Sequence, residues 1–168
     1  MAAFRDGDSD RLDYLLLRDG PVVKYFDRHV LESDLTWLRE HGYVVSRFDA
    51  GRWEDHGPLD EIARELEFPS YFGRNLNALN DCLRDLSIPE EGGRAIVFER
   101  YELAQKASSE LAWTLLDIFA SSSHFHLLFG LRLIVLVQTD DPRFRIAEVG
   151  GCPVGWNLRE WANKARGV

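Results

Sequence analysis

The chain has 168 residues, 45% hydrophobic and 29% charged, which is typical of globular domains and excludes a disordered chain. Twenty Lys and Arg against 28 Asp and Glu give a formal net charge of −8, which disfavours nucleic acid as a partner of the whole molecule and suits a cationic protein. Two cysteines are too few for a disulfide framework, and no apolar run reaches the roughly 20 residues of a membrane span. Since the start carries no apolar signal segment, we expect a cytoplasmic protein that forms one compact unit.

The predicted elements alternate between strands and helices. Asp19-Gly20 favours a hairpin turn between two short apolar runs, and Ser33 can cap a helix that stops at Gly42. Pro58 suits the first turn of another helix, where its missing N–H is not needed. In chain order we expect strands at residues 13–17 and 22–26, a helix at 34–41, a strand at 43–48, helices at 58–66 and 76–86, a strand at 95–98, a helix at 110–119 and a strand at 131–137.

The C-terminal segment, residues 139–168, is expected to add a strand and a helix. Residues 144–149 form a short apolar stretch after a proline-containing turn. Asn157 and Glu160 have the spacing of a capping box for a last helix that ends near Arg166. The alternation of strands and helices predicts an α/β fold with a mainly parallel sheet and right-handed crossovers.

Two histidines, His124 and His126, raise the question of a metal site. Alternate residues of a strand face the same way, so both rings could bind one ion. No third ligand lies nearby in the sequence, and the serines before the pair are typical of a loop. We therefore favour a solvated loop without a metal or cofactor, and a small metal-dependent enzyme remains an alternative.

The cysteines are interpreted as structural. Cys82 lies on a helical apolar stripe with Leu79 and Leu83, so we expect a buried, unpaired and inert thiol. The glycines around Cys152 lack the spacing of a phosphate-binding loop and favour a turn. No histidine stands beside Cys152 by local spacing, which argues against a nucleophilic site.

One polar cluster accompanies the predicted helix at residues 76–86. Asn75 can cap this helix, whose leucines face the core, while its polar residues share the opposite face. Aromatic residues beside a carboxylate on a rigid helix are typical of a protein-binding surface, although an aromatic staple with a solvated face fits the same spacing. The candidate partner-binding residues are Tyr71, Phe72, Gly73, Asn75, Asn77, Asn80, Asp81, Arg84 and Asp85.

This segment resembles the central motif of the barstar family, the intracellular inhibitors of the ribonuclease barnase. The sequence FPSYFGRNLNALNDCL at residues 68–83 follows the family order of a proline, two aromatics, a glycine, an asparagine, leucines and a later aspartate. The order of predicted elements over residues 43–138 agrees with that family too. The resemblance implies a barstar-like core at 43–138, in which a small, mainly parallel sheet packs with helices, and extensions at 1–42 and 139–168.

The resemblance also implies a function. In that family the loop and the inhibitor helix plug the ribonuclease active site. Tyr71 matches the contact tyrosine, and Asp81 matches the aspartate that occupies the phosphate site of the enzyme. A carboxylate on a preorganised helix is a reasonable mimic of a phosphate anion. We therefore expect a non-enzymatic immunity protein whose partner is a cationic ribonuclease or a toxin nuclease domain, with no nucleic acid, membrane or cofactor bound directly.

Three departures from the family pattern bear on the target. Asn77 stands where the family has a second contact aspartate, and Asn80 replaces a tryptophan. Ser121 lies near the position of a contact glutamate. Because fewer acids reach the surface, the target need not be barnase itself, and a non-inhibitory adaptor with the same fold is an alternative function.

Overall fold

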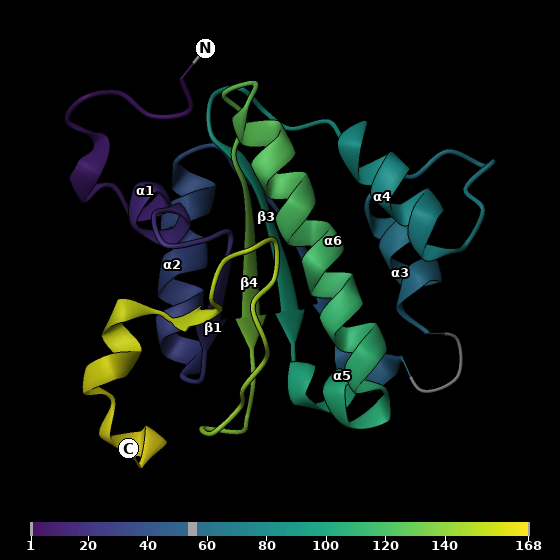
Figure 1. Cartoon of the computed structure of the whole chain (residues 1–168). Coiled ribbons are helices and arrows are strands. Elements are labelled where there is room, and N and C mark those ends of the chain that lie inside the picture. The colour runs from purple at the N-terminus through teal and green to yellow at the C-terminus, as the bar shows by residue number, and fades with distance from the viewer. Residues whose placement is uncertain (1, 54–56, 168) are drawn as a thin grey trace.

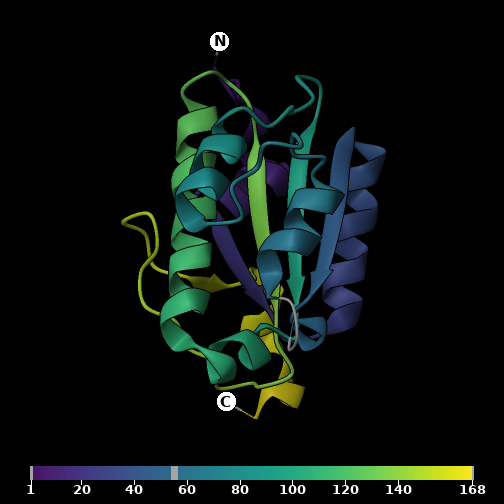
Figure 2. The ribbon, with the colours of Figure 1, turned by 90° about the vertical axis from the view of Figure 1, so that its right-hand side faces the viewer.

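The computed structural model describes residues 2–53 and 57–167, and its central feature is a five-stranded sheet between two layers of helices (Figures 1 and 2). The strands are β1 (Val22–Tyr25), β2 (Tyr43–Asp49), β3 (Gly93–Glu99), β4 (Leu133–Gln138) and β5 (Gly155–Trp156). The helices of the described residues are α1 (Leu12–Leu17), α2 (Arg28–Glu40), α3 (Pro58–Glu65), α4 (Leu76–Arg84), α5 (Tyr101–Ala107) and α6 (Ser109–Leu127). Short 3-10 turns are η1 (Asp8–Asp10), η2 (Ala50–Arg52), η3 (Leu158–Ala162) and η4 (Lys164–Arg166).

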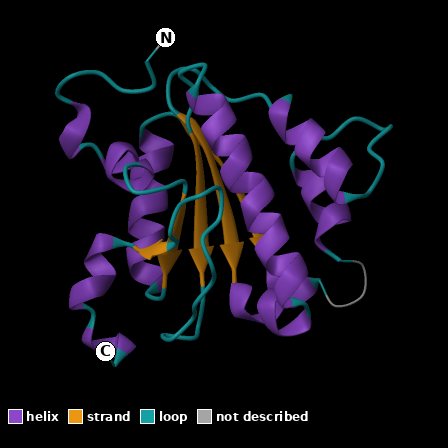
Figure 3. Cartoon of the chain, viewed as in Figure 1, coloured by secondary structure: helices purple, strands orange, loops and turns teal. Residues whose placement is uncertain are grey.

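The sheet has the order β2-β3-β4-β1-β5, and each pair of neighbours is parallel (Figure 3). Val135 of β4 pairs with Ile96 of β3 on one side and with Val22 of β1 on the other. All six residues of β4 are buried, which explains its unbroken apolar sequence LIVLV. The predicted α/β class with a parallel sheet is confirmed.

The two faces of the sheet bury separate cores. Helices α1 and α2 cover one face, where Leu31, Leu35 and Leu38 pack against Tyr25 of β1. Helices α3 to α6 cover the other face, where leucines of α4 and Phe119 of α6 pack against Phe98 of β3 and its neighbours (Figure 2). Helix α4 is therefore anchored on one side by the core and leaves its other side for the surface.

The N-terminal extension differs from the predicted hairpin. Residues 13–17 lie in helix α1, and β1 pairs with β4 and β5 instead of with its sequence neighbour. The apolar run is too short for its periodicity to separate strand from helix, and the turn at Gly20 only ends the helix. Helix α2 starts earlier than predicted, because the Asp27 side chain accepts a hydrogen bond from His29 N and caps it.

The C-terminal extension also differs from its prediction. Residues 144–149 form no strand, and only Val149 makes an isolated bridge, to Cys152. The sheet takes β5 from residues 155–156 instead. Asn157 caps η3, but the Glu160 carboxylate accepts hydrogen bonds from Phe26 N and Asp27 N instead of closing a capping box, and 3-10 turns replace the predicted helix.

Lys24 is a buried cation on β1. Its side chain is 6% exposed, its Nζ donates to the Phe144 carbonyl oxygen at 3.3 Å, and its Nζ lies 4.5 Å from the centroid of the Trp156 ring. Burial, with help from the nearby charges of Arg166 and Arg145, lowers the pKa of Lys24 from 10.5 to about 8. Because the folded state disfavours the charged form, protonated Lys24 reduces the free energy of unfolding.

Replacing Lys24 by Met should therefore stabilise the protein at pH 7, by about 1–3 kcal/mol. The penalty of the charge is complete below pH 8 and fades as the pH rises toward 10.5, so the gain from Lys24→Met should shrink over that interval. Urea unfolding at pH 7 and pH 10 measures both effects, with the exposed Lys106→Met as control. A variant that is less stable than the parent at pH 7 would show that contacts with Trp156 outweigh the desolvation.

Candidate partner-binding site

The loop before α4 is tied to the helix by Asn75. Its side-chain oxygen accepts from Ala78 N at 2.8 Å, and its Nδ2 donates to the Gly73 carbonyl oxygen at 3.1 Å. The predicted cap is confirmed, and the same residue fixes both the helix start and the loop. An added Cβ at Gly73 would lie 3.1 Å from this Nδ2, so a larger residue would press on the cap.

Helix α4 divides into the two predicted faces. Leu79 and Leu83 are fully buried, whereas the polar residues of the other face are exposed. Cys82 is only half-buried, contrary to the predicted burial, because it lies at the boundary between the two faces. The exposed polar residues are Asn77, Asp81, Arg84 and Asp85, and Asn80 is half-buried.

The two aromatic residues before the helix behave differently. The half-buried Phe72 packs on Phe68, with ring centroids 5.2 Å apart, and both rings pack against the core. Tyr71 is 83% exposed. Phe72 therefore anchors the loop to the core, whereas Tyr71 is left exposed to a partner.

Asp81 is an exposed carboxylate in the middle of α4. Within residues 2–53 and 57–167 its side chain makes no hydrogen bond or ion pair. Arg74, which precedes the helix with a left-handed φ of 50°, instead pairs with Asp60 at 3.3 Å. Asp81 can thus meet an external cation without first breaking a contact of its own.

Helix α6 holds the end of α4 from behind. Ser122 Oγ and His126 Nε2 both donate to the Leu83 carbonyl oxygen, at 3.2 and 2.8 Å. This carbonyl belongs to the last turn of α4, where its backbone donor is the Leu86 N–H at a long 3.4 Å. The serines and histidines predicted as a loop are therefore the last turns of a longer helix, in which small buried serines pack against neighbouring backbone.

The two histidines of α6 face different partners. His126 is buried against α4, whereas His124 Nε2 lies 3.9 Å from Cys152 Sγ. Sequence spacing could not predict the second pair, since it joins segments far apart in the chain. Among the described residues no group of three His, Cys, Asp or Glu side chains could hold a metal ion.

Comparison with protein-family models gives a match over residues 43–138 to Barstar (barnase inhibitor), and these residues are more than half of the chain. The chain belongs to the barstar family. A search of the curated proteins finds no match. Members of the barstar family are inhibitors and not enzymes, and the loop and helix described above lie inside the matched segment. The matched barstar segment begins at β2 and ends at the last residue of β4, so β1 and β5 lie outside it.

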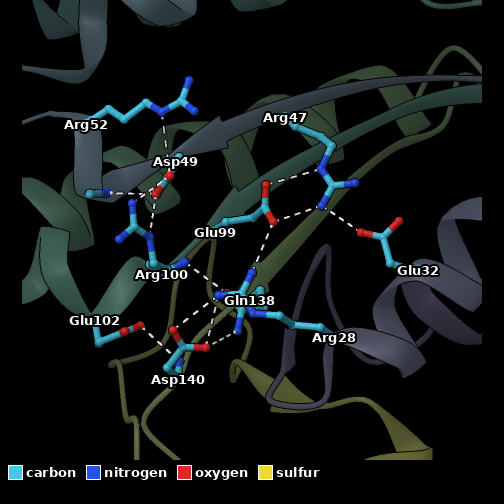
Figure 4. Close-up of polar contacts among 11 residues, drawn as sticks. Arg28, Glu32, Arg47, Asp49, Arg52, Glu99, Arg100, Glu102, Gln138 and Asp140 are labelled. Carbon is cyan, nitrogen blue, oxygen red and sulfur yellow. Dashed lines mark hydrogen bonds and ion pairs between the residues drawn. The ribbon is translucent and has the colours of Figure 1, made fainter.

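The barstar segment also carries an ion-pair network at the carboxyl ends of its strands (Figure 4). Arg100 donates to the Asp49 carboxylate at 2.8 and 2.6 Å, which lowers the pKa of Asp49. Arg47 pairs with Glu99 at 2.8 Å and with Glu32 of α2 at 2.7 Å. This network could not be predicted from the sequence, because its members come from separate elements.

This edge is where ligands bind in many open α/β sheets. Here, however, each guanidinium is already matched by a carboxylate. Arg28, for example, contacts both Glu99 and Asp140, and the Asp140 backbone N–H donates to Glu102 (Figure 4). The network therefore joins β2, β3 and α2, and its guanidinium groups are already paired, whereas Asp81 on α4 is an exposed carboxylate with no side-chain partner among the described residues.

The thiol of Cys82 provides a test of how α4 is packed. Burial raises its pKa, and the carboxylates of Asp85 and Asp81 raise it further. We expect iodoacetamide to label Cys82 several-fold more slowly in the native protein at pH 8 than in urea. Mass spectrometry of the labelled peptides measures the rates. Equal rates in the two states, or a disulfide between Cys82 and Cys152, would contradict the described packing.

No helix in the described part of the chain is long and apolar enough to cross a membrane.

Proposed function

We propose that this chain inhibits a bacterial ribonuclease or a ribonuclease-type toxin, and that residues 69–85 block the active site of that enzyme. Membership of the barstar family supports the class of partner. The observation that carries the mechanism is the exposed carboxylate of Asp81, which has no side-chain partner among the described residues, on a helix whose end is fixed by two hydrogen bonds to the Leu83 carbonyl oxygen.

The proposed inhibitor acts by imitation of the substrate. A ribonuclease holds cationic groups where the RNA phosphate binds, and Asp81 would enter that position already oriented by α4. Tyr71 would add an aromatic anchor at the edge of the contact. The net charge of −8 would speed the encounter with a cationic enzyme. Such an immunity protein would act in the cytoplasm of the cell that produces the nuclease.

A second candidate function is that of an adaptor with no inhibitory role. The observation that favours it is the loss of acidic or aromatic groups at Asn77, Asn80 and Ser121. The same departures are compatible with a ribonuclease other than barnase, whose active site requires fewer acids. Inhibition assays separate the two functions.

The experiment is a titration of RNA hydrolysis. Barnase, and any ribonuclease domain found to be encoded beside this gene, are assayed with increasing amounts of the purified protein. We expect at least one of these enzymes to lose its activity at a one-to-one ratio. If every enzyme remains active with excess protein, the inhibitor proposal is wrong and the adaptor becomes the leading hypothesis.

A further inference from the structure

A second exposed feature lies at the C-terminal end of α6. Leu128 is 78% exposed and Phe129 is 59% exposed, beside the half-buried Phe125. The rings of Phe125 and Phe129 are in contact, with centroids 5.1 Å apart. We call these three residues the apolar patch. Side chains of this size in contact on a surface are typical of interaction sites.

The helix cap does not account for the patch. Leu131 N donates to the His126 carbonyl oxygen and Gly130 N to that of Leu127, which is the hydrogen-bond pattern of a Schellman motif. Gly130 has the left-handed φ of 77° that this motif needs. The apolar contact that accompanies a Schellman motif is made by the residue after the glycine, which here is Leu131. The cap therefore does not require apolar side chains at Leu128 and Phe129. The cap holds them outward on an ordered backbone.

The apolar patch continues the surface of α4. The Arg84 guanidinium lies 5.4 Å from the centroid of the Phe125 ring, so one of the candidate partner-binding residues touches the patch directly. The Leu83 carbonyl fixes this end of α4 to the same turns of α6. A partner that covers Asp81 and Arg84 would therefore reach the apolar patch as well.

We propose that the apolar patch binds the same ribonuclease whose active site Asp81 is proposed to enter. The patch would contact apolar side chains of that enzyme beside its cationic active site. This inference rests on the proposed function. Apolar anchors would supply binding energy at a surface where Asn77, Asn80 and Ser121 provide no charge. A stable interface buries roughly 1,600 Å² of surface, far more than two exposed side chains can bury. The patch is therefore part of a larger contact and not a dimer interface by itself.

The test compares the double variant Leu128→Ser/Phe129→Ser with Leu158→Ser. Leu158 is a matched control, because it is 53% exposed and belongs to η3 of the C-terminal extension. Calorimetry is performed with the enzyme that the titration above identifies. We expect the double variant to bind at least tenfold more weakly and the control to bind like the parent. Circular dichroism verifies that both variants are folded.

The other outcomes separate the two proposals. If Asp81→Ala weakens binding but the double variant does not, the inference about the patch is wrong and the proposed inhibition stands. If the double variant weakens binding but Asp81→Ala does not, the active-site mechanism is wrong. Sedimentation measures self-association, and a parent dimer that the double variant abolishes, with unchanged affinity for the enzyme, would show that the patch binds a second copy. A parent that binds none of the enzymes would overturn both proposals.

Discussion

Asp81→Ala should weaken the complex with the target ribonuclease by about 2–5 kcal/mol, mainly through faster dissociation. A carboxylate that leaves water incurs a large desolvation cost, so it contributes to affinity only where several donors meet it. Its removal would leave the cations of the enzyme buried without a counter-charge. Because Asp81 is exposed and makes no side-chain hydrogen bond or ion pair with the described residues, the variant should fold like the parent.

Two further variants calibrate this result. Tyr71→Ala should weaken binding by about 1–3 kcal/mol, as expected for an exposed aromatic anchor. Glu90→Ala should change it by less than about 1 kcal/mol, since Glu90 is an exposed charge outside the loop and helix. Calorimetry with the folded variants measures all three. An Asp81→Ala variant that binds as tightly as the parent would disprove the active-site mechanism.

Asp13→Ala should lower the free energy of unfolding by about 2–4 kcal/mol. This carboxylate is fully buried in α1 and accepts from Arg11 at 2.9 Å and from the Tyr43 hydroxyl at 2.8 Å. It also lies 3.8 Å from Arg132, which is only 12% exposed. Without Asp13, the hydroxyl of β2 and the nearby guanidinium would lose a buried partner.

The pH dependence of the same group has a definite sign. Burial tends to raise the pKa of Asp13, but the hydrogen bonds from Arg11 and Tyr43 outweigh it and lower the pKa below 3.8. The carboxylate therefore stabilises the folded state fully above pH 3.8, and this contribution is lost as the pH falls through the lower folded-state value. Urea unfolding between pH 7 and pH 2 should show the difference between the parent and Asp13→Ala shrink as the pH falls. Asp19→Ala, at a 77% exposed side chain, is the control and should have little effect.

The sequence predicted the elements that local chemistry determines. Strands β3 and β4 are apolar on both faces, and α4 has a cap at Asn75 and a regular stripe of leucines. The run at residues 13–17 is too short to distinguish a strand from a helix, and the serines of α6 resemble a loop until their hydrogen bonds to α4 and β4 are known. Local sequence signals determine β3, β4 and α4, whereas long-range packing determines the structure of residues 13–17 and of the last turns of α6.

The candidate site shows the same division. The faces of α4 follow from helical spacing, so the exposure of Asn77 and Asp81 was predictable. The contact of Arg84 with Phe125 and that of His124 with Cys152 each join segments far apart in the sequence. No periodicity in a single chain encodes such pairs. The exposed face of α4 was therefore predictable from the sequence, whereas its contacts with α6 were not.

The strand order has a consequence for how the chain is made. Val22 in β1 pairs with Val135 in β4, and β5 adds to the far side of β1. On a ribosome, β1 emerges early but has no neighbour until nearly the whole protein has been synthesised. Until β4 emerges, β1 and the edge of β3 that later pairs with β4 both lack a partner strand. The insertion of β4 between β3 and β1 therefore closes two open edges in one late step of synthesis, which shortens the time for which they could pair with another chain.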